Sequence, residues 1–95
     1  MINIDKKMQK YGYKKVEEDC YDVIYEKIED QGFTHVVTIV RKSSGKHILQ
    51  SYDKKVISLN GHFMNECCGI EIPVLFLMWL KAKKMSRKYH WKKVD

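Results

Sequence analysis

Residues 13–53 read YKKVEEDCYDVIYEKIEDQGFTHVVTIVRKSSGKHILQSYD, and this stretch decides the fold. It is rich in Val, Ile, Thr and Tyr, which favour extended backbone, and it is interrupted by the segments EDQG and KSSG. Interruptions of this kind are typical of tight turns between antiparallel strands. We therefore predict strands near residues 13–17, 20–29, 33–42 and 46–53.

The two turns also predict how the strands pair. Each holds a three-residue loop with glycine last, at residues 30–32 and 43–45, which suits a type I turn followed by a bulge. These loops place Glu29 opposite Phe33, Tyr25 opposite Val37, Val23 opposite Ile39, and Ile39 opposite Leu49. One face of the sheet then collects the side chains that we expect to form the core, namely Tyr21, Val23, Tyr25, Phe33, Val37, Ile39 and Leu49.

The opposite face of the predicted sheet is more apolar than a purely solvated face should be. Besides polar residues such as Thr34 and Thr38, it carries a patch that a monomer does not readily expose to water, formed by Ile24, Ile28, Val36, Val40, Ile48 and Tyr52. An N-terminal helix can cover this patch, with Ile2, Ile4, Met8 and Tyr11 facing inward. Otherwise a second copy of the chain, forming a homodimer through the sheet face, or a target protein covers it.

Helical segments flank the strands. A short helix is expected over IDKKMQKY (residues 4–11), capped by Asn3 or Asp5 and ended by Gly12. A longer helix is expected over residues 72–90, with Pro73 near its first position. Residues 74–80 are apolar on every side, which predicts that this half of the helix is deeply buried.

These elements predict one α+β domain over residues 1–95. It consists of an antiparallel sheet of four to five strands, with the long C-terminal helix packed on one face, and a short N-terminal helix. The fifth strand is placed at VISL, residues 56–59, within residues 54–70, the stretch whose structure the sequence predicts least well.

The net charge of +6 is concentrated at one end of the chain. Residues 81–95, including the basic tail at 91–95, hold seven of the 18 Lys and Arg residues but one of the 12 acidic residues. A surface of this kind attracts anionic partners, and an indole beside it can stack. We predict a binding surface formed by Lys81, Lys84, Arg87, Lys88, Trp91, Lys92 and Lys93. The alternative is a solvated helix end whose bases offset the helix dipole.

Several function classes are not expected. The N-terminus has no apolar signal region, and the run Ile72–Leu80 is too short to span a bilayer, so we expect a cytoplasmic protein without a membrane partner. Adjacent Cys67 and Cys68, even with His62 and Cys20, do not fit the spaced pairs of a zinc site, so we expect no metal and no cofactor. Cysteine catalysis with His35, His47 or His62 needs a proximity that sequence does not establish. The run Glu17–Asp19 is interpreted as a solvated turn.

The chain resembles a known group of proteins. The segments GYKKVEEDCYDVIYEK (residues 12–27) and THVVTIVRKSSGKHILQSYD (residues 34–53), followed by a helix dense in Lys and Arg, resemble small uncharacterised proteins of phages, prophages and mobile elements of low-GC Gram-positive bacteria. The resemblance implies a context and no role for any single residue.

This resemblance implies a non-enzymatic accessory protein. We expect it to bind stoichiometrically to, and to inhibit, a host nucleic-acid-handling or defence complex, in an anti-CRISPR-like role in the host cytoplasm. The alternative is a basic nucleic-acid-binding protein that uses its C-terminal helix. A small cysteine-dependent enzyme is the third hypothesis.

Overall fold

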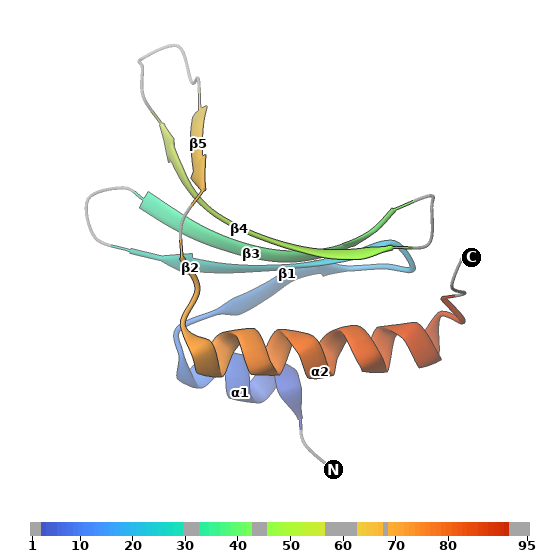
Figure 1. The fold of residues 1–95 in the computed structure, drawn as a ribbon. Helices are drawn as coiled ribbons and strands as arrows, with labels where there is room; N and C mark the ends of the chain where they lie inside the picture. Colours follow the sequence, from blue (N-terminus) through green and yellow to red (C-terminus); the bar gives the residue numbers. More distant parts are fainter. Residues whose placement is uncertain (1–2, 30–32, 43–45, 57–62, 68, 92–95) are drawn as a thin grey trace.

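The computed structural model describes residues 3–29, 33–42, 46–56, 63–67 and 69–91. Within these ranges, five antiparallel strands form one sheet in which each strand pairs with the next in the chain (Figure 1). The strands are β1 (Lys14–Glu18), β2 (Asp22–Ile28), β3 (Phe33–Arg41), β4 (His47–Val56) and β5 (Phe63–Cys67). The helices α1 (Ile4–Lys10) and α2 (Ile72–Lys88) complete an α+β fold, as predicted.

The observed register of the sheet confirms the prediction from the turns. Val23 pairs with Ile39, and Ile39 pairs with Leu49. The Glu29 amide donates to the Phe33 carbonyl at 2.9 Å. Tyr21, however, is exposed rather than part of the core, because it lies in the turn before β2 and not on the pleated strand.

The position predicted for a fifth strand is wrong. Val56 is the last residue of β4, residues 57–59 lie outside the described part of the chain, and β5 begins at Phe63. The fifth strand was misplaced because β3 is long enough to pair with β4 as far as Lys55. The first residues of β3, Phe33 and Thr34, pair with Lys55 and Lys54, so β4 continues past the end that the sequence suggested.

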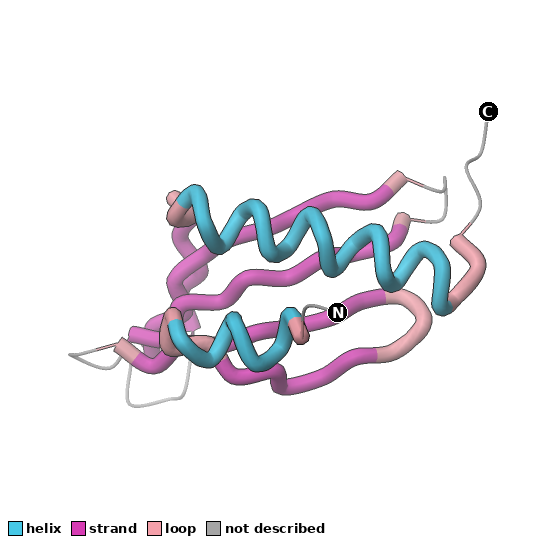
Figure 2. Tube along the Cα trace, turned by 90° about the horizontal axis from the view of Figure 1, so that it is seen from below, coloured by secondary structure: helices cyan, strands magenta, loops and turns pink. Residues whose placement is uncertain are grey.

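Both helices pack on the same face of the sheet (Figures 1 and 2). The core that they enclose with the strands is formed by Ile4, Met8, Tyr13, Val23, Tyr25, Val37, Ile39, Val74, Leu77, Met78, Met85 and Trp91. Of the two alternatives for the opposite face, the one in which α1 covers it is therefore wrong. Ile4 and Met8 do point inward, but toward the face that α2 also covers, because one helix is too narrow to cover a sheet of this width.

Local signals explain where the helices begin and end. Asn3 caps α1 by accepting a hydrogen bond from the Lys6 amide at 3.1 Å, and Gly12 follows the helix with φ +92°. The longer helix α2 ends at Lys88, earlier than predicted, because His90 adopts the left-handed conformation with φ 55°. No helix in the described ranges is both long and apolar enough to cross a membrane.

Candidate functional site

The outward side of α2 is the most unusual surface of the molecule. It carries apolar side chains that are largely exposed: Ile72 at 79 %, Leu75 at 43 %, Phe76 at 54 % and Trp79 at 52 %. The exposed bases Lys83 and Arg87 continue the same line toward the end of the helix, because residues spaced by three or four share one face. We call this set, Ile72, Leu75, Phe76, Trp79, Lys83 and Arg87, the outer stripe.

The prediction that residues 74–80 are buried on every side is thus wrong for three of these seven residues. Val74, Leu77 and Met78 do enter the core. Leu75, Phe76 and Trp79 do not, because the sheet contacts only one side of α2 and no other described element reaches its outward side. Exposed patches of large apolar side chains mark interaction surfaces more often than single exposed residues do.

The aromatic part of the outer stripe is ordered by its own contacts. The rings of Phe76 and Trp79 are stacked, with centroids 6.0 Å apart and planes inclined by 30°. The Lys83 ammonium lies 3.9 Å from the centroid of the Trp79 ring, which is favourable cation–π geometry. The outer stripe therefore presents a joined aromatic and cationic surface to its surroundings.

The inner side of α2 holds a cation. Lys81 is 8 % exposed, and its Nζ atom lies 2.6 Å from Glu18 Oε1 and 3.2 Å from Asp5 Oδ1. Glu18 also accepts from Tyr89 at 2.7 Å and from Lys88 at 3.3 Å. Burial alone would raise the pKa of Glu18, but the hydrogen bonds from Lys81 and Tyr89 outweigh it and lower this pKa to about 2. Glu18 thus stays ionised and holds α2 against β1.

A second carboxylate extends this network to α1. Asp5 accepts from the Tyr25 hydroxyl and lies 2.9 Å from Lys15 Nζ. Burial pushes the pKa of Asp5 upward, yet its bonds to Tyr25, Lys15 and Lys81 hold the pKa below its usual value. Burial and the contact with Asp5 raise the pKa of Tyr25. These polar contacts join both helices to the sheet.

The predicted basic surface is only partly found on the outside. Lys81 faces inward, and Trp91 is also 8 % exposed, with its indole N–H donating to the Cys20 carbonyl at 2.7 Å. The expectation that these residues share an outward binding surface is therefore wrong. The reason is that the carboxylates of Glu18 and Asp5 need a buried cation, and the carbonyl of Cys20 needs a donor.

The other residues of the predicted basic surface have different positions. Lys84 and Arg87 are exposed, and Lys88 is exposed although it also bonds Glu18. Lys92 and Lys93 lie outside the described residues. Lys83, which the prediction did not single out, lies on the outer stripe, and its spacing of four from Trp79 is the signal that would have found it.

The sheet face opposite the helices has no helical cover in the described part of the chain (Figure 1). Ile24, Val40, Ile48 and Tyr52 are partly exposed there, and Ile28 is 87 % exposed. Val36 is buried nonetheless, flanked by its cross-strand neighbours Glu26 and Tyr52. This face is thus a second, less exposed apolar surface.

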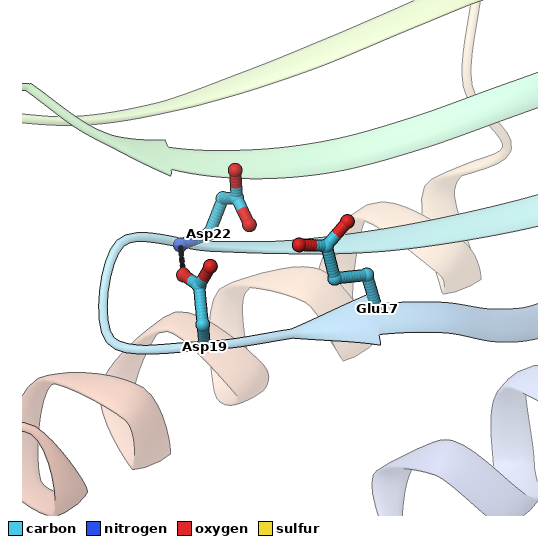
Figure 3. Close-up of side chains that lie close together, drawn as sticks. All are labelled: Glu17, Asp19 and Asp22. Atoms are coloured by element: carbon cyan, nitrogen blue, oxygen red, sulfur yellow. Dashed lines mark hydrogen bonds between the residues drawn. The ribbon is translucent and has the colours of Figure 1, made fainter.

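Three carboxylates gather at the turn between β1 and β2 (Figure 3). Oxygens of Glu17, Asp19 and Asp22 lie within 4.8 Å of one another, close enough to hold a cation. Burial, followed by the charges of Asp19 and Glu17, raises the pKa of Asp22. Asp19 already accepts from the amides of Tyr21 at 2.7 Å and Asp22 at 3.0 Å. These bonds give Asp19 a turn-forming role. The prediction of a solvated turn over Glu17–Asp19 is wrong for Glu18, which is the last residue of β1 and whose carboxylate is buried by its contacts with Lys81 and Tyr89.

Sequence reasoning missed a polar cluster on the core face. His35 Nδ1 lies 2.8 Å from Asp53 Oδ1, and His35 Nε2 lies 3.2 Å from Ser51 Oγ. The three side chains are arranged in the order Asp–His–Ser, as in the catalytic triad of a serine hydrolase. Such an enzyme also needs hydrogen-bond donors near the serine to stabilise the oxyanion that forms during the reaction. Ser51 Oγ instead donates to the Gly69 carbonyl at 3.4 Å, and a carbonyl oxygen repels an oxyanion. The cluster therefore joins β3, β4 and the segment that leads into α2.

The predicted register contained the signal for this cluster. The same pairing that sets Ile39 opposite Leu49 sets His35 opposite Asp53. Of the residues considered for metal binding or cysteine catalysis, Cys20 is exposed and free, whereas Cys68, His62 and the side chain of Cys67 lie outside the described residues.

Comparisons with known proteins do not add to this description. No family model, no curated protein and no solved structure matches the chain.

Proposed function

We propose that the protein is a non-enzymatic, stoichiometric binding protein, and that the outer stripe of α2 is its main contact surface. The observation that supports this proposal best is the exposure of Phe76 and Trp79, each more than half exposed on a helix that otherwise packs well. Burying such a side chain contributes about 1.5–3 kcal/mol, which a partner can supply. Trp and Arg, both present here, are enriched among residues that dominate binding energy.

The partner that we propose is a host complex that handles nucleic acid or defends the cell against it. The support for this part is the resemblance of residues 12–27 and 34–53 to phage and mobile-element proteins. Small accessory proteins of such elements commonly bind and block host machinery. We therefore propose inhibition, in an anti-CRISPR-like manner, as the result of binding and the host cytoplasm as its place.

The uncovered sheet face supplies a second contact in this proposal. Its residues, Ile24, Ile28, Val36, Val40, Ile48 and Tyr52, were predicted as an interface. No helix of the described chain covers this face, and all of these residues except the buried Val36 are at least partly exposed. This face and the outer stripe point to opposite sides of the molecule. One chain can therefore bridge two surfaces of a large complex, or pair with a second copy through the sheet while α2 stays accessible.

A capture experiment tests the proposal. The tagged chain is incubated with host lysate, with and without nuclease, and compared with the double variant Phe76→Ser, Trp79→Ser. We expect a partner that survives nuclease and is lost with the double variant, because the variant removes apolar contact area but no core residue. Tyr11→Ser, at an exposed aromatic residue of the α1 end, is the matched control and should retain the partner. Equal capture by the double variant would refute the role of the outer stripe.

Direct nucleic-acid binding is the second candidate. The stacking of Lys83 on Trp79, with Arg87 on the same line, offers both a phosphate contact and an aromatic surface. Against it, Lys81 and Trp91 are used inside the fold. Phosphate binding predicts an affinity that falls with salt, with a logarithmic slope of about −0.9 per contact.

Charge neutralisation separates the two candidates. The variant with Gln at Lys84, Arg87, Lys88, Lys92 and Lys93 is compared with wild type for binding to DNA and RNA at low salt. Binding that is lost in the variant supports the second candidate. A wild-type chain with no affinity for either nucleic acid eliminates it, and leaves protein contact as the function.

A further inference from the structure

The outer stripe is apolar at its first end and basic at its second, and this pattern indicates the chemistry of the partner. We infer that α2 docks into a protein groove with an apolar floor and with carboxylates at the end that receives Lys83 and Arg87. This inference rests on the proposed function and specifies its partner.

The two parts of the outer stripe differ in chemistry. From Ile72 to Leu80 the helix carries no charged residue, and from Lys81 to Lys88 it carries no acidic one. With a rise of about 1.5 Å per residue, the apolar part from Ile72 to Trp79 spans roughly 10 Å, and Lys83 and Arg87 follow about 6 Å and 12 Å beyond Trp79. A complementary groove is therefore apolar over about two helical turns and acidic over the next two.

A second copy of α2 lacks this complementarity when the two copies pair in parallel or antiparallel about the midpoint of the outer stripe. If two copies pair in parallel, Lys83 and Arg87 meet the same bases on the other chain, which is repulsive. If they pair antiparallel about their midpoints, Ile72 lies against Arg87 and Phe76 against Lys83, so each apolar part faces a charge. Both arrangements leave the cations without carboxylates, because the outer stripe contains none.

A lipid surface or a polyanion also fits less well than a protein groove. Helices that lie in a membrane interface place bases along both edges of the apolar face, whereas here Lys83 and Arg87 follow the apolar part along the helix axis and share its face. A nucleic acid would pair with these bases but would leave Ile72 and Phe76 without an apolar contact. A protein groove can satisfy both parts at once.

Lys83 links the two parts. Its ammonium lies 3.9 Å from the centroid of the Trp79 ring in the free chain, so it is already placed at the junction of apolar and basic surface. A carboxylate that approaches this point contacts a cation that the Trp79 ring already favours there, which reduces the entropy lost on binding. We therefore expect the contributions of Lys83 and Trp79 to binding to be coupled.

Three synthetic helical peptides test the inference. They share one apolar face of Leu and Phe and differ at one end, which carries Glu, Gln or Lys. Fluorescence anisotropy of the labelled peptides is measured against the purified chain. We expect the Glu peptide to bind about three- to tenfold more tightly than the Gln peptide, with the Lys peptide weakest, since exposed ion pairs contribute modestly. The Glu–Gln difference should vanish at about 1 M salt.

A charge reversal gives the sharpest control. The variant Lys83→Glu, Arg87→Glu should reverse the order and prefer the Lys peptide, while Trp79→Ala should weaken binding of all three. Equal affinity of wild type for the three peptides overturns the acidic groove, although capture of a partner through Phe76 and Trp79 would still support the proposed function. Wild type that binds no peptide also overturns it. The inference is also overturned if the chain self-associates and Phe76→Ser abolishes this self-association. It is overturned likewise if the chain binds only to phosphatidylglycerol vesicles.

Discussion

The inner side of α2 buries a lysine, whereas the outer side of the same helix exposes a tryptophan. Lys81 lies inside because Glu18 and Asp5 surround its ammonium with carboxylates, so the charge is paired where it is buried. Trp79 lies outside because the sheet contacts only the other side of the helix. The burial of Lys81 and the exposure of Trp79 thus follow from the groups that face each side chain and not from its hydropathy. The inner side of α2 packs against the sheet and pairs with Glu18 and Asp5, whereas no described element packs against the apolar side chains of the outer stripe.

The largest effect is expected from a comparison of two apolar residues of α2, one on each side of the helix. Met78→Ala should lower the free energy of unfolding by about 3 kcal/mol, because it opens a cavity among fully buried side chains. Phe76→Ala removes a larger side chain from the outer stripe and should cost less than about 1 kcal/mol. Urea unfolding of both variants measures this. If Phe76→Ala were as destabilising as Met78→Ala, the outward side of α2 would be part of the core.

Two lysines give the next comparison. Lys81→Ala should cost about 2 kcal/mol, because it leaves Glu18 and Asp5 with fewer partners in a mostly buried position, although Lys15, Lys88 and Tyr89 remain. Lys83→Ala should change stability by less than about 0.5 kcal/mol, since its contact with Trp79 is on the surface. Thermal unfolding at neutral pH separates the two. Equal effects would show that the ion pairs of Lys81 with Glu18 and Asp5 stabilise the fold no more than the surface contact of Lys83 does.

Acid should weaken the inner side selectively. In the folded chain the pKa of Glu18 is about 2, below its ordinary value of 4.5. Its ionisation therefore stabilises the fold above about pH 4.5, and this contribution, on the order of 2 kcal/mol after allowance for solvent screening, is lost as the pH falls toward 2.

Unfolding between pH 7 and pH 2 measures this loss. Glu18→Gln should be less stable than wild type at pH 7 and should approach it at pH 2. The matched control Glu29→Gln, at an exposed residue, should stay parallel to wild type. A constant gap between Glu18→Gln and wild type across this range would refute the assignment.

The two tryptophans give the smallest expected effect. Trp91→Phe removes the indole donor from the Cys20 carbonyl and should cost about 1 kcal/mol, whereas Trp79→Phe should be nearly neutral. Acrylamide quenching provides the readout. Fluorescence of Trp91→Phe, which comes from exposed Trp79, should be quenched strongly, and that of Trp79→Phe weakly. The reverse order would contradict the placement of both rings.

The part of the fold that the sequence predicts correctly depends on local chemistry. The glycines at positions 32 and 45 predicted two three-residue loops, and this prediction was enough to place Val23 opposite Ile39 and Ile39 opposite Leu49, as observed. Pro73 and Gly12 likewise predict where α2 begins and α1 ends. Each of these signals acts over a few residues, so it can be interpreted without knowing the rest of the chain.

The part that sequence reasoning missed depends on distant contacts. Lys81 meets Glu18 and Trp91 meets Cys20 across most of the chain, and no local pattern marks either pair. The run of apolar residues 74–80 indicated burial, but it could not reveal that both helices lie on one face and leave the outer stripe uncovered. The sequence therefore predicted the sheet well and the candidate binding surface poorly.

The order of the strands has a consequence for synthesis. Because each strand pairs with the one before it, the sheet can grow as the chain leaves the ribosome, starting from β1 and β2. The helix that covers most of its apolar face is α2, which follows every described strand. Until α2 emerges, a nascent sheet exposes Val23, Val37 and Ile39 to other chains, so ribosome-bound chaperones have a substrate here that the finished protein no longer offers.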